Sequence, residues 1–256
     1  MYEAERERAI LRVVAEQDFV SVQDLTQRLD ISEATIRRDL KRLSEGGRIR
    51  RVRGGAQSIE RPVLTGQPQF GADQGRNAAA KRAIAERAAA LCEPGDSIVL
   101  DGGTTVFAMT EFLGSIGLRV LTNSFPVAHA LSTSTTNRVS VLGGEIYREQ
   151  QVIASPYPQP MVAGFSARRL FLSAQAVGLH GLMQTDPLLI HGSLALLERA
   201  EEVVALVDSS KFERRGVHVS CPLQKVDVLI TDAGISAGAR RMVTEAGVSL
   251  VIAEVR

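Results

Sequence analysis

Apolar residues near the start of the chain recur at helical spacing and predict two short helices separated by a brief extended segment. The first helix covers residues 3–17 and ends before Phe19-Val20, a pair that favours a short strand. The second begins at Ser21, because Ser21 followed by Asp24 forms a capping-box pattern with Asp in place of the usual Glu or Gln. Its buried face consists of Val22, Leu25 and Leu29.

A third helix is predicted after the Asp30-Ile31 turn, with Ser32 placed to cap its first turn. Its buried stripe consists of Ile36, Leu40 and Leu43. At about 100° per residue, the opposite face combines basic and small side chains, namely Ala34, Thr35, Arg38, Lys41 and Arg42. Arg37 lies on the flank and suits a backbone contact. Asp39 lies near the core edge and is expected to orient an Arg, since phosphate would repel it.

A basic ribbon follows this helix. Residues 48–55 alternate basic and apolar side chains and close on a glycine pair, as the wing hairpin of a DNA-binding domain would. From Ala34 to Gly55 there are eight Lys or Arg against two acidic residues, although the whole chain carries a formal net charge of only +1. Such a concentration of positive charge is the electrostatic footprint of phosphate binding.

Two helices around a tight turn, followed by a basic hairpin, are the elements of a winged helix-turn-helix. A basic helix face alone is better explained as a solvated surface, and it is the adjoining ribbon that favours double-stranded DNA. Arg can read guanine edges in a major groove, Lys can hold phosphate, and small residues permit close approach. The predicted DNA contacts are Ser32, Ala34, Thr35, Arg37, Arg38, Lys41, Arg42, Arg51 and Arg53.

Length and composition fit two domains. With 256 residues, 45% of them apolar, the chain can bury a sizeable core, and that core must be aliphatic because there is no Trp and only 4% of residues are aromatic. Residues 58–76 contain several Gly and Pro and few periodic apolar positions, which predicts a linker. The predicted organisation is a DNA-binding domain at 1–57, a linker at 58–76 and a second domain at 77–256.

In the second domain helix and strand patterns alternate. Helices are predicted over residues 78–92, about 187–200 and 237–246. The predicted strands are 97–100, 119–121, 139–142, 170–172, 203–207, 226–230 and 249–252. This alternation predicts an α/β domain built on a mostly parallel sheet with helices on both faces.

Polar loops follow four of these strands, at the edge where open parallel sheets bind ligands. Gly102 and Gly103 let the backbone approach a ligand, and Thr104 and Thr105 add hydroxyls where a helix begins, which suits an anion. Lys211 adds a cation after a later strand. The residues expected to complete the cradle are Ser124, Gly143 and Gly144. Each loop alone is an ordinary turn, but together they favour a phosphorylated ligand.

Other kinds of site find little support. Cys92 and Cys221 stand alone without metal-ligand spacing and are expected to be buried thiols in a reducing cytoplasm. The four His are scattered, so we predict neither a metal nor a cofactor. No run approaches the roughly 18 apolar residues of a membrane span, and the charged N-terminus is unlike a signal peptide. The predicted location is therefore the cytoplasm, with no membrane partner.

Several motifs together carry a resemblance to a known family. They are ISEATIRRDLKRLSEGGRIRRVRGGA in the first domain, and DGGTT, LTNSFPVA, VLGGEIYR and VALVDSSKF in the second. In these motifs the chain resembles the DeoR family of bacterial sugar-metabolism repressors over nearly its whole length. The first motif and DSSKF are specific, whereas the glycine-rich loops are less so.

The resemblance implies a sensor domain similar in fold to ribose-5-phosphate isomerase, which binds a sugar phosphate without turning it over. It also implies homo-oligomers on an operator, usually repressing a sugar-utilisation operon. The implied effector is a phosphorylated sugar or sugar acid. Carried over onto the matching motifs, the effector contacts are Asp101, Gly102, Gly103, Thr104, Thr105, Asn123, Ser124, Gly143, Gly144 and Lys211.

Two segments depart from the family pattern. Where many members carry a Glu pair and then a Lys at a helix start, this chain has Leu188, Leu189 and Ser193. The polar residues left to replace them are Thr185, Asp186 and His191. A helix cap explains His191 equally well. Residues 153–165 hold three prolines in a region that is usually Gly-bearing and helical, so both departures imply a different sugar head, such as a sugar acid, with the phosphate end retained.

Three functional hypotheses follow. The first is a DNA-binding regulator without enzymatic activity, whose operator binding is controlled by the ligand of the second domain. The second is a sugar-phosphate isomerase-like enzyme with a DNA-binding head, for which Asp101, Glu145, Asp186 and Asp208 supply carboxylates. The third is a second domain that has lost its ligand and only oligomerises. We favour the first, because the missing acid–Lys pair weakens the enzyme hypothesis.

Overall fold

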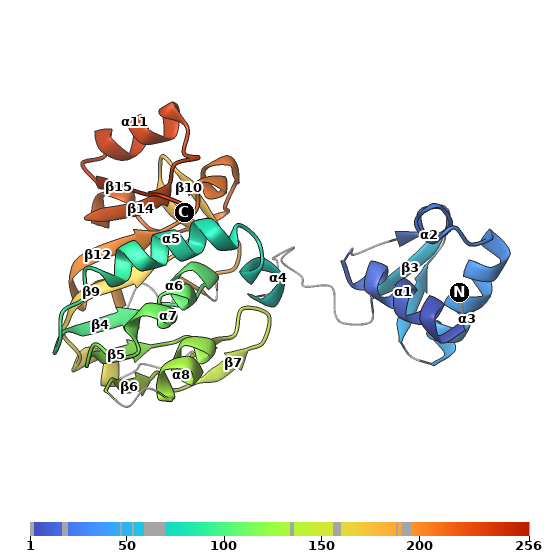
Figure 1. Ribbon diagram of the computed structural model, residues 1–256, viewed down its shortest axis with the longest axis horizontal. Helices are drawn as coiled ribbons and strands as arrows, with labels where there is room; N and C mark the ends of the chain where they lie inside the picture. The colour runs from blue at the N-terminus through green and yellow to red at the C-terminus, as the bar shows by residue number, and fades with distance from the viewer. Residues whose placement is uncertain are drawn as a thin grey trace. The chain divides into compact units, whose positions relative to one another are not determined.

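The computed structural model describes residues 3–16, 20–46, 48–52, 54–58, 70–133, 136–155, 160–187, 189–190 and 196–255. The chain forms two compact units, Met1–Gly66 and Gln67–Arg256 (Figure 1). Within the described ranges, no helix combines the length and the apolar character that crossing a bilayer requires.

The N-terminal unit packs three helices against a small antiparallel sheet. Its elements are α1 (Glu3–Glu16), β1 (Val20–Ser21), α2 (Val22–Leu29), α3 (Glu33–Glu45), β2 (Ile49–Val52) and β3 (Gly55–Ser58). The strand order is β1-β3-β2. The aliphatic core includes Ile10, Val14, Leu25, Ile36, Leu40, Leu43 and Ile49. The predicted stripe of the third helix is thereby confirmed, and so is the helix-turn-helix with its hairpin.

The caps predicted around the turn are also present. The Ser21 hydroxyl accepts a hydrogen bond from the Asp24 backbone N–H at 3.0 Å, and the Asp24 carboxylate accepts one from the Ser21 backbone N–H at 3.3 Å. Asp30 ends α2 in the left-handed conformation, with φ of 53°. Ser32 caps α3. An N-cap side chain such as Ser21 or Ser32 contributes about 0.5–2 kcal/mol. Together the three residues define where α2 begins and ends and where α3 begins.

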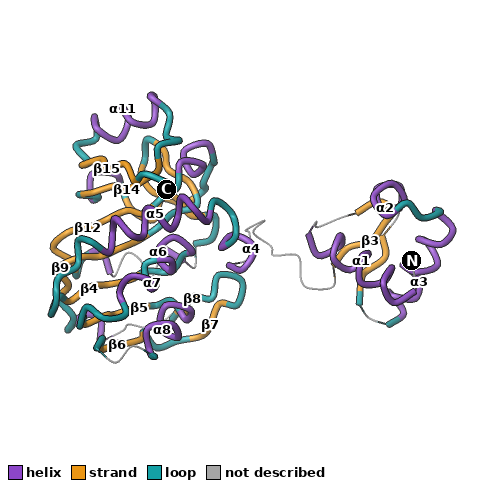
Figure 2. Tube along the Cα trace, viewed as in Figure 1, coloured by secondary structure: helices purple, strands orange, loops and turns teal. Residues whose placement is uncertain are grey.

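The C-terminal unit is built on a seven-stranded sheet, whose strands are orange in Figure 2. Its strands are β4 (Ser97–Leu100), β5 (Arg119–Thr122), β6 (Arg138–Val141), β9 (Ala167–Leu172), β12 (Ala200–Leu206), β14 (Val228–Asp232) and β15 (Ser249–Ala253). The order is β15-β14-β12-β9-β4-β5-β6, and every neighbouring pair is parallel. The predicted α/β class is confirmed, and all seven predicted strands are present with bounds shifted by up to three residues.

Helices cover both faces of this sheet. One face packs against α5 (Ala78–Ala89), α6 (Thr104–Ala108), α7 (Thr110–Leu113) and α8 (Phe125–Ser132), with Ile84, Met109 and Leu131 in the buried core. The other face packs against α9 (Pro160–Ala163), α11 (Ala237–Glu245) and a small antiparallel sheet. That sheet consists of β10 (Ala176–Gly178), β11 (Gly181–Gln184) and β13 (His218–Cys221). The shorter elements are the hairpin β7 (Glu145–Tyr147) and β8 (Val152–Ala154), and the 3₁₀ turns η1 (Ser209–Glu213) and η2 (Leu223–Lys225).

The order of the strands creates a crevice in the middle of the sheet. The chain enters at β4, adds β5 and β6 on one side, and then crosses to β9 on the other side of β4. The loops leaving β4 and β9 therefore diverge at their carboxyl ends. Such a switch point is where ligands bind in open α/β sheets.

Residues 58–76, predicted to be a linker, contain a helix of the C-terminal unit. This helix, α4 (Phe70–Gln74), is anchored by the buried Phe70, whose ring packs edge-on against Phe107 with centroids 5.6 Å apart. The C-terminal unit starts at Gln67, ten residues before the predicted boundary at 77. A five-residue helix is too short to show a helical repeat in the sequence, and this is why the Gly and Pro content suggested a linker.

Two further predicted features are described only in part. Of the helix predicted over about 187–200, residues 188 and 191–195 lie outside the described residues, and β12 already begins at Ala200. Of segment 153–165, residues 156–159 lie outside, while α9 occupies Pro160–Ala163.

Candidate functional site

The candidate DNA-binding face begins at the N-terminus of α3. Ser32 accepts a hydrogen bond from the Thr35 backbone N–H, and the two hydroxyl oxygens lie 2.9 Å apart. Ser32, Ala34 and Glu33 are exposed, and Thr35 is half-buried. The start of the helix therefore presents small side chains at the end that helix-turn-helix domains direct at base edges.

The basic residues of α3 differ in how firmly they are held. Arg37 donates to the Glu33 carboxylate at 2.9 Å, and Lys41 lies 3.7 Å from Glu45. Both are exposed pairs of the kind that contribute little to stability. Arg38 is exposed and has no ion pair with any residue that the structure describes. Among these cations Arg38 is the one most available to a base edge.

Arg42 bridges two helices instead of standing clear of them. Its guanidinium donates to Glu7 on α1 at 2.8 Å and to Asp39 at 3.2 Å. Asp39 is 1% exposed and also accepts a hydrogen bond from Arg6 at 2.9 Å. Asp39 therefore orients arginines, as predicted. Because Arg42 holds α1 against α3, it has a structural role that the sequence pattern did not reveal.

The wing is present as the hairpin of β2 and β3. Arg51 lies opposite Ala56 in the antiparallel register and has an exposed side chain, whereas Ile49 is buried in the core. Arg48 is exposed, and its guanidinium lies 3.7 Å from Glu7. Arg53, the other predicted wing contact, lies outside the described residues.

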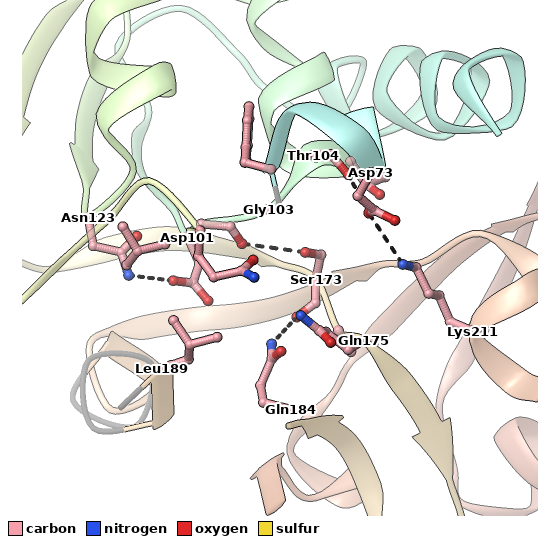
Figure 3. Close-up of a pocket in the computed structure, with 16 residues that line it drawn as sticks. Asp73, Asp101, Gly103, Thr104, Asn123, Ser173, Gln175, Gln184, Leu189 and Lys211 are labelled. Carbon is pink, nitrogen blue, oxygen red and sulfur yellow. Dashed lines mark hydrogen bonds and ion pairs between the residues drawn. The ribbon is translucent and has the colours of Figure 1, made fainter. Parts of the chain in front are cut away.

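A pocket opens at the carboxyl ends of β4 and β9 in the C-terminal unit (Figure 3). Seven of the ten residues predicted to contact an effector line it: Asp101, Gly102, Gly103, Thr104, Thr105, Asn123 and Lys211. The remaining lining residues are Phe70, Asp73, Gln150, Val152, Ser173, Ala174, Gln175, Gln184 and Leu189. The pocket therefore occupies the predicted edge of the sheet, but its wall extends to elements that the motifs did not indicate.

One end of the pocket is lined by amides and hydroxyls. The Asn123 side-chain amide donates to Asp101 at 2.6 Å, and both residues are buried. The Asn123 side-chain oxygen, Oδ1, is buried with no hydrogen-bond partner among the described residues. The Gln184 amide donates to the Ser173 carbonyl at 3.3 Å, on the wall opposite. Groups of this kind donate to and accept from hydroxyls, as a sugar body requires.

The other end is cationic. Lys211 is 5% exposed, and its ammonium lies 3.5 Å from the Asp73 carboxylate, which is also 3.2 Å from the Lys81 ammonium. Burial lowers the pKa of Lys211, although the charge of Asp73 opposes that effect. Burial works to raise the pKa of Asp73, but Lys211, Lys81 and a hydrogen bond from Thr104 outweigh it, so this pKa falls below its usual value. The two lysines and Thr104 therefore stabilise the charged form of the Asp73 carboxylate.

Residues 185–193 are the segment that departs from the family pattern, and only some of its described residues reach the pocket. Leu189, which the resemblance places where an acid was expected, lines the pocket. Thr185 donates to Gln175, a lining residue, at 3.2 Å, and the Asp186 carboxylate accepts from the Tyr147 hydroxyl at 2.6 Å. Asp186 is therefore bound to the β7 hairpin and does not line the pocket. His191 and Ser193 lie outside the described residues.

Three predicted effector contacts do not line the pocket in the part of the chain described. The Ser124 hydroxyl caps α8 by accepting from the Val127 backbone N–H. Gly143 and Gly144 are exposed at the entry to β7. At Gly144, φ is 150° and a Cβ would lie 2.3 Å from the Ala154 carbonyl oxygen. The close approach of β8 therefore accounts for the glycine at 144.

Sequence reasoning missed lining residues for a physical reason. Ser173 and Gln175 follow β9, and Gln184 ends β11, so they come together only through the tertiary fold. Ser173 and Gln175 stand after a strand like the polar residues of the other loops, and that position was the available signal. Asp73, on a five-residue helix, offered no comparable signal.

Replacing Gly103 by alanine is expected to close the pocket and to destabilise the fold. Gly103 has φ of 135°, and a Cβ there would lie 2.1 Å from the Ser173 hydroxyl oxygen. A strained non-glycine residue of this kind costs about 1–3 kcal/mol. Urea denaturation would show a lower midpoint, and calorimetry would show lost ligand binding. Gly114→Ala is the control, because no atom lies within 4 Å of its added Cβ and φ is not in the left-handed region. Unchanged ligand binding in Gly103→Ala would contradict this placement of the pocket.

Metal and thiol chemistry find no centre in the described part of the chain. No group of three or more His, Cys, Asp or Glu side chains there is placed to hold a metal ion. Cys221 is buried, but Cys92 is only half-buried, so the expectation of two buried thiols holds for one of them. Burial raises the pKa of Cys92 to about 11 and that of Cys221 to about 12, so both remain neutral thiols.

Comparison with known proteins covers both units. A family model described as a DeoR-like helix-turn-helix domain matches residues 6–62, and one described as a DeoR C terminal sensor domain matches residues 76–233. The chain is 30% identical over 253 residues to the HTH-type transcriptional regulator UlaR of Shigella dysenteriae, covering 98% of this chain and 99% of the relative. It is 31% identical over the same length to UlaR of Salmonella arizonae, with the same coverage.

The chain is also similar to solved structures over part of its length. Ribose 5-phosphate isomerase A from Methanocaldococcus jannaschii is 18% identical, with a TM-score of 0.39 over 52% of this chain and 53% of that chain. The eIF2B beta subunit from Chaetomium thermophilum is also 18% identical, with a TM-score of 0.44 over 59% of this chain and 48% of that chain.

Proposed function

Since the chain belongs to the DeoR family and is a DNA-binding transcriptional regulator, we propose that it represses a carbohydrate-utilisation operon under control of a ligand in its C-terminal unit. The ligand we propose is a phosphorylated sugar or sugar acid. Operator binding would be performed by α3 and the wing, with the predicted contacts from Ser32 to Arg53. The repressor would act as a homo-oligomer, since operators are commonly paired half-sites.

The observation that carries this proposal is the two-ended character of the pocket. Lys211 makes one end cationic, while Asn123, Ser173 and Gln184 make the other end a set of amides and hydroxyls. A phosphorylated sugar has the matching pair of ends, an anionic group and a hydroxylated body. Lysine is a common phosphate ligand in proteins.

Control of DNA binding would follow from unequal affinity. A ligand that binds the DNA-competent arrangement and the incompetent arrangement equally shifts nothing, so the pocket must differ between them. The reciprocal of this coupling is that operator DNA changes the affinity for the ligand by the same factor.

A calorimetric screen of phosphorylated sugars and phosphorylated sugar acids tests the ligand class directly. We expect one compound to bind with micromolar affinity and its dephosphorylated form to bind at least about tenfold more weakly, a loss of about 1.4 kcal/mol. A parallel assay for turnover of the bound compound separates regulation from an isomerase-like activity. Product formation would favour the enzyme hypothesis, and the absence of any binding compound would favour a C-terminal unit that only oligomerises.

A further inference from the structure

The anion position of the pocket already contains a carboxylate supplied by α4. Oδ2 of Asp73 lies 3.2 Å from the Lys81 ammonium and 3.5 Å from the Lys211 ammonium, and it accepts a hydrogen bond from the Thr104 hydroxyl at 3.1 Å. Two ammonium groups and a hydroxyl are the donors that a phosphate oxygen requires. Figure 3 shows Asp73 between Thr104 and Lys211 at the pocket wall.

We propose that Asp73 is an internal counter-anion, which occupies the position of the effector's anionic group and is displaced by it together with α4. The inference rests on the proposed function, because it assumes that an anionic ligand enters this pocket. It adds a regulatory device to that function. It also assigns Lys81 to the anion site, although this residue does not line the open pocket and is paired with Asp73.

The carboxylate satisfies the site incompletely. Its second oxygen, Oδ1, is buried without a hydrogen-bond partner among the described residues, and an unpaired buried acceptor is costly. One negative charge faces two ammonium groups here, and the nearby Asp208 and Arg214 add one charge of each sign. A phosphate dianion would bring more charge and more acceptor oxygens to the same donors. The anion site therefore favours replacement of the Asp73 carboxylate by a phosphate group.

Few contacts hold α4 in place. The helix has five residues, and its Gly71, Ala72 and Gln74 are exposed. Besides the ion pairs of Asp73 and the Lys81 hydrogen bond to its carbonyl, α4 is held by the Phe70 ring against Phe107 and by the Phe70 backbone N–H, which donates to the Glu149 carbonyl at 2.9 Å. Loss of the Asp73 contacts removes the polar half of this anchorage.

The position of α4 in the chain gives its displacement a consequence. It is the first described helix after the DNA-binding unit. Displacement of α4 by a ligand would therefore move the end of the segment that joins the two units in sequence. Competition between Asp73 and the ligand makes α4 docking and ligand binding mutually exclusive. Each then weakens the other by the same factor.

Phosphate binding by the full chain with Asp73→Asn tests the exchange, with inorganic phosphate as the probe and ionic strength held constant. Asparagine keeps the shape and an acceptor for Thr104 but removes the competing charge. We expect the phosphate Kd to fall about tenfold relative to the unchanged protein, because the apparent affinity of a self-occupied site is reduced by the fraction that is open. Lys211→Ala in the Asp73→Asn background should abolish this binding. Glu111→Gln, at an exposed ion pair with Arg82, is the matched control and should leave Kd unchanged.

The outcomes separate the inference from the proposed function. Equal or weaker phosphate binding by Asp73→Asn, still dependent on Lys211, overturns the exchange and leaves the anion site standing. Absence of binding even in Asp73→Asn overturns both, because removal of the competitor should expose any anion site.

A second measurement needs no variant, so it tests the displacement even if Asp73→Asn fails to fold. Hydrogen exchange in the unchanged protein should show the Phe70 amide, which is bonded to Glu149, exchanging faster when phosphate is bound. Phosphate-induced protection of Phe70–Gln74 would contradict displacement.

Discussion

Replacing Lys211 by alanine is expected to abolish the response to the ligand, while operator binding in its absence is retained. Lys211 is a buried cation at the anionic end of the pocket, 3.5 Å from Asp73. Truncating one partner of a buried charge pair costs about 2–5 kcal/mol, so the ligand should bind weakly or not at all. The measurement is calorimetry with the bound compound, followed by operator titration in its presence.

The matched control for this change is Lys225→Ala. Lys225 is an exposed lysine on η2 of the same unit and does not line the pocket, so its loss should alter neither binding reaction. If Lys211→Ala abolished operator binding in a folded protein, the division of labour between the two units would be wrong.

Replacing Arg38 by alanine is expected to weaken operator binding by about 1–3 kcal/mol, the usual value of an arginine that contacts a base edge. Arg38 is exposed and unpaired with respect to the described residues, so its loss should leave the fold and ligand binding intact. Fluorescence anisotropy with the protein's own upstream DNA measures the change, at one salt concentration because phosphate contacts make affinity salt-dependent.

Arg241→Ala provides the charge-matched control, since it removes one exposed positive charge from α11 of the C-terminal unit. Equal losses in the two variants would mean that Arg38 acts only through net charge.

Arg42→Ala should behave differently from both, because Arg42 joins α3 to Glu7 of α1 and its loss should lower stability as well as DNA affinity.

Local chemistry made the DNA-binding unit predictable from the sequence. The Ser21–Asp24 capping box, the Ser32 cap and the stripe of Ile36, Leu40 and Leu43 are all encoded within a few residues of one another. The bridging role of Arg42 was not predictable in the same way, because Glu7 is 35 positions away and meets it only when α1 packs on α3.

The ligand pocket was predictable only where a motif stands at the end of a strand. Asp101 to Thr105 follow β4 directly and Lys211 stands in the loop after β12, and the structure places them in the pocket. The glycine pair at 143–144 has the same appearance in the sequence, yet neither residue lines the pocket, and the packing of β8 accounts for Gly144. Asp73 reaches the pocket from a segment too short to have a helical repeat, so tertiary structure was needed to find it.

Operator affinity measured with and without a panel of phosphorylated sugars and sugar acids, at fixed salt, tests the central claim most directly. We predict that one compound shifts the affinity of the unchanged protein by about 5–150-fold, the usual range of an allosteric coupling, and that the same compound has no effect on Lys211→Ala. A compound that binds the C-terminal unit through Lys211 but leaves operator affinity unchanged would contradict ligand control of DNA binding.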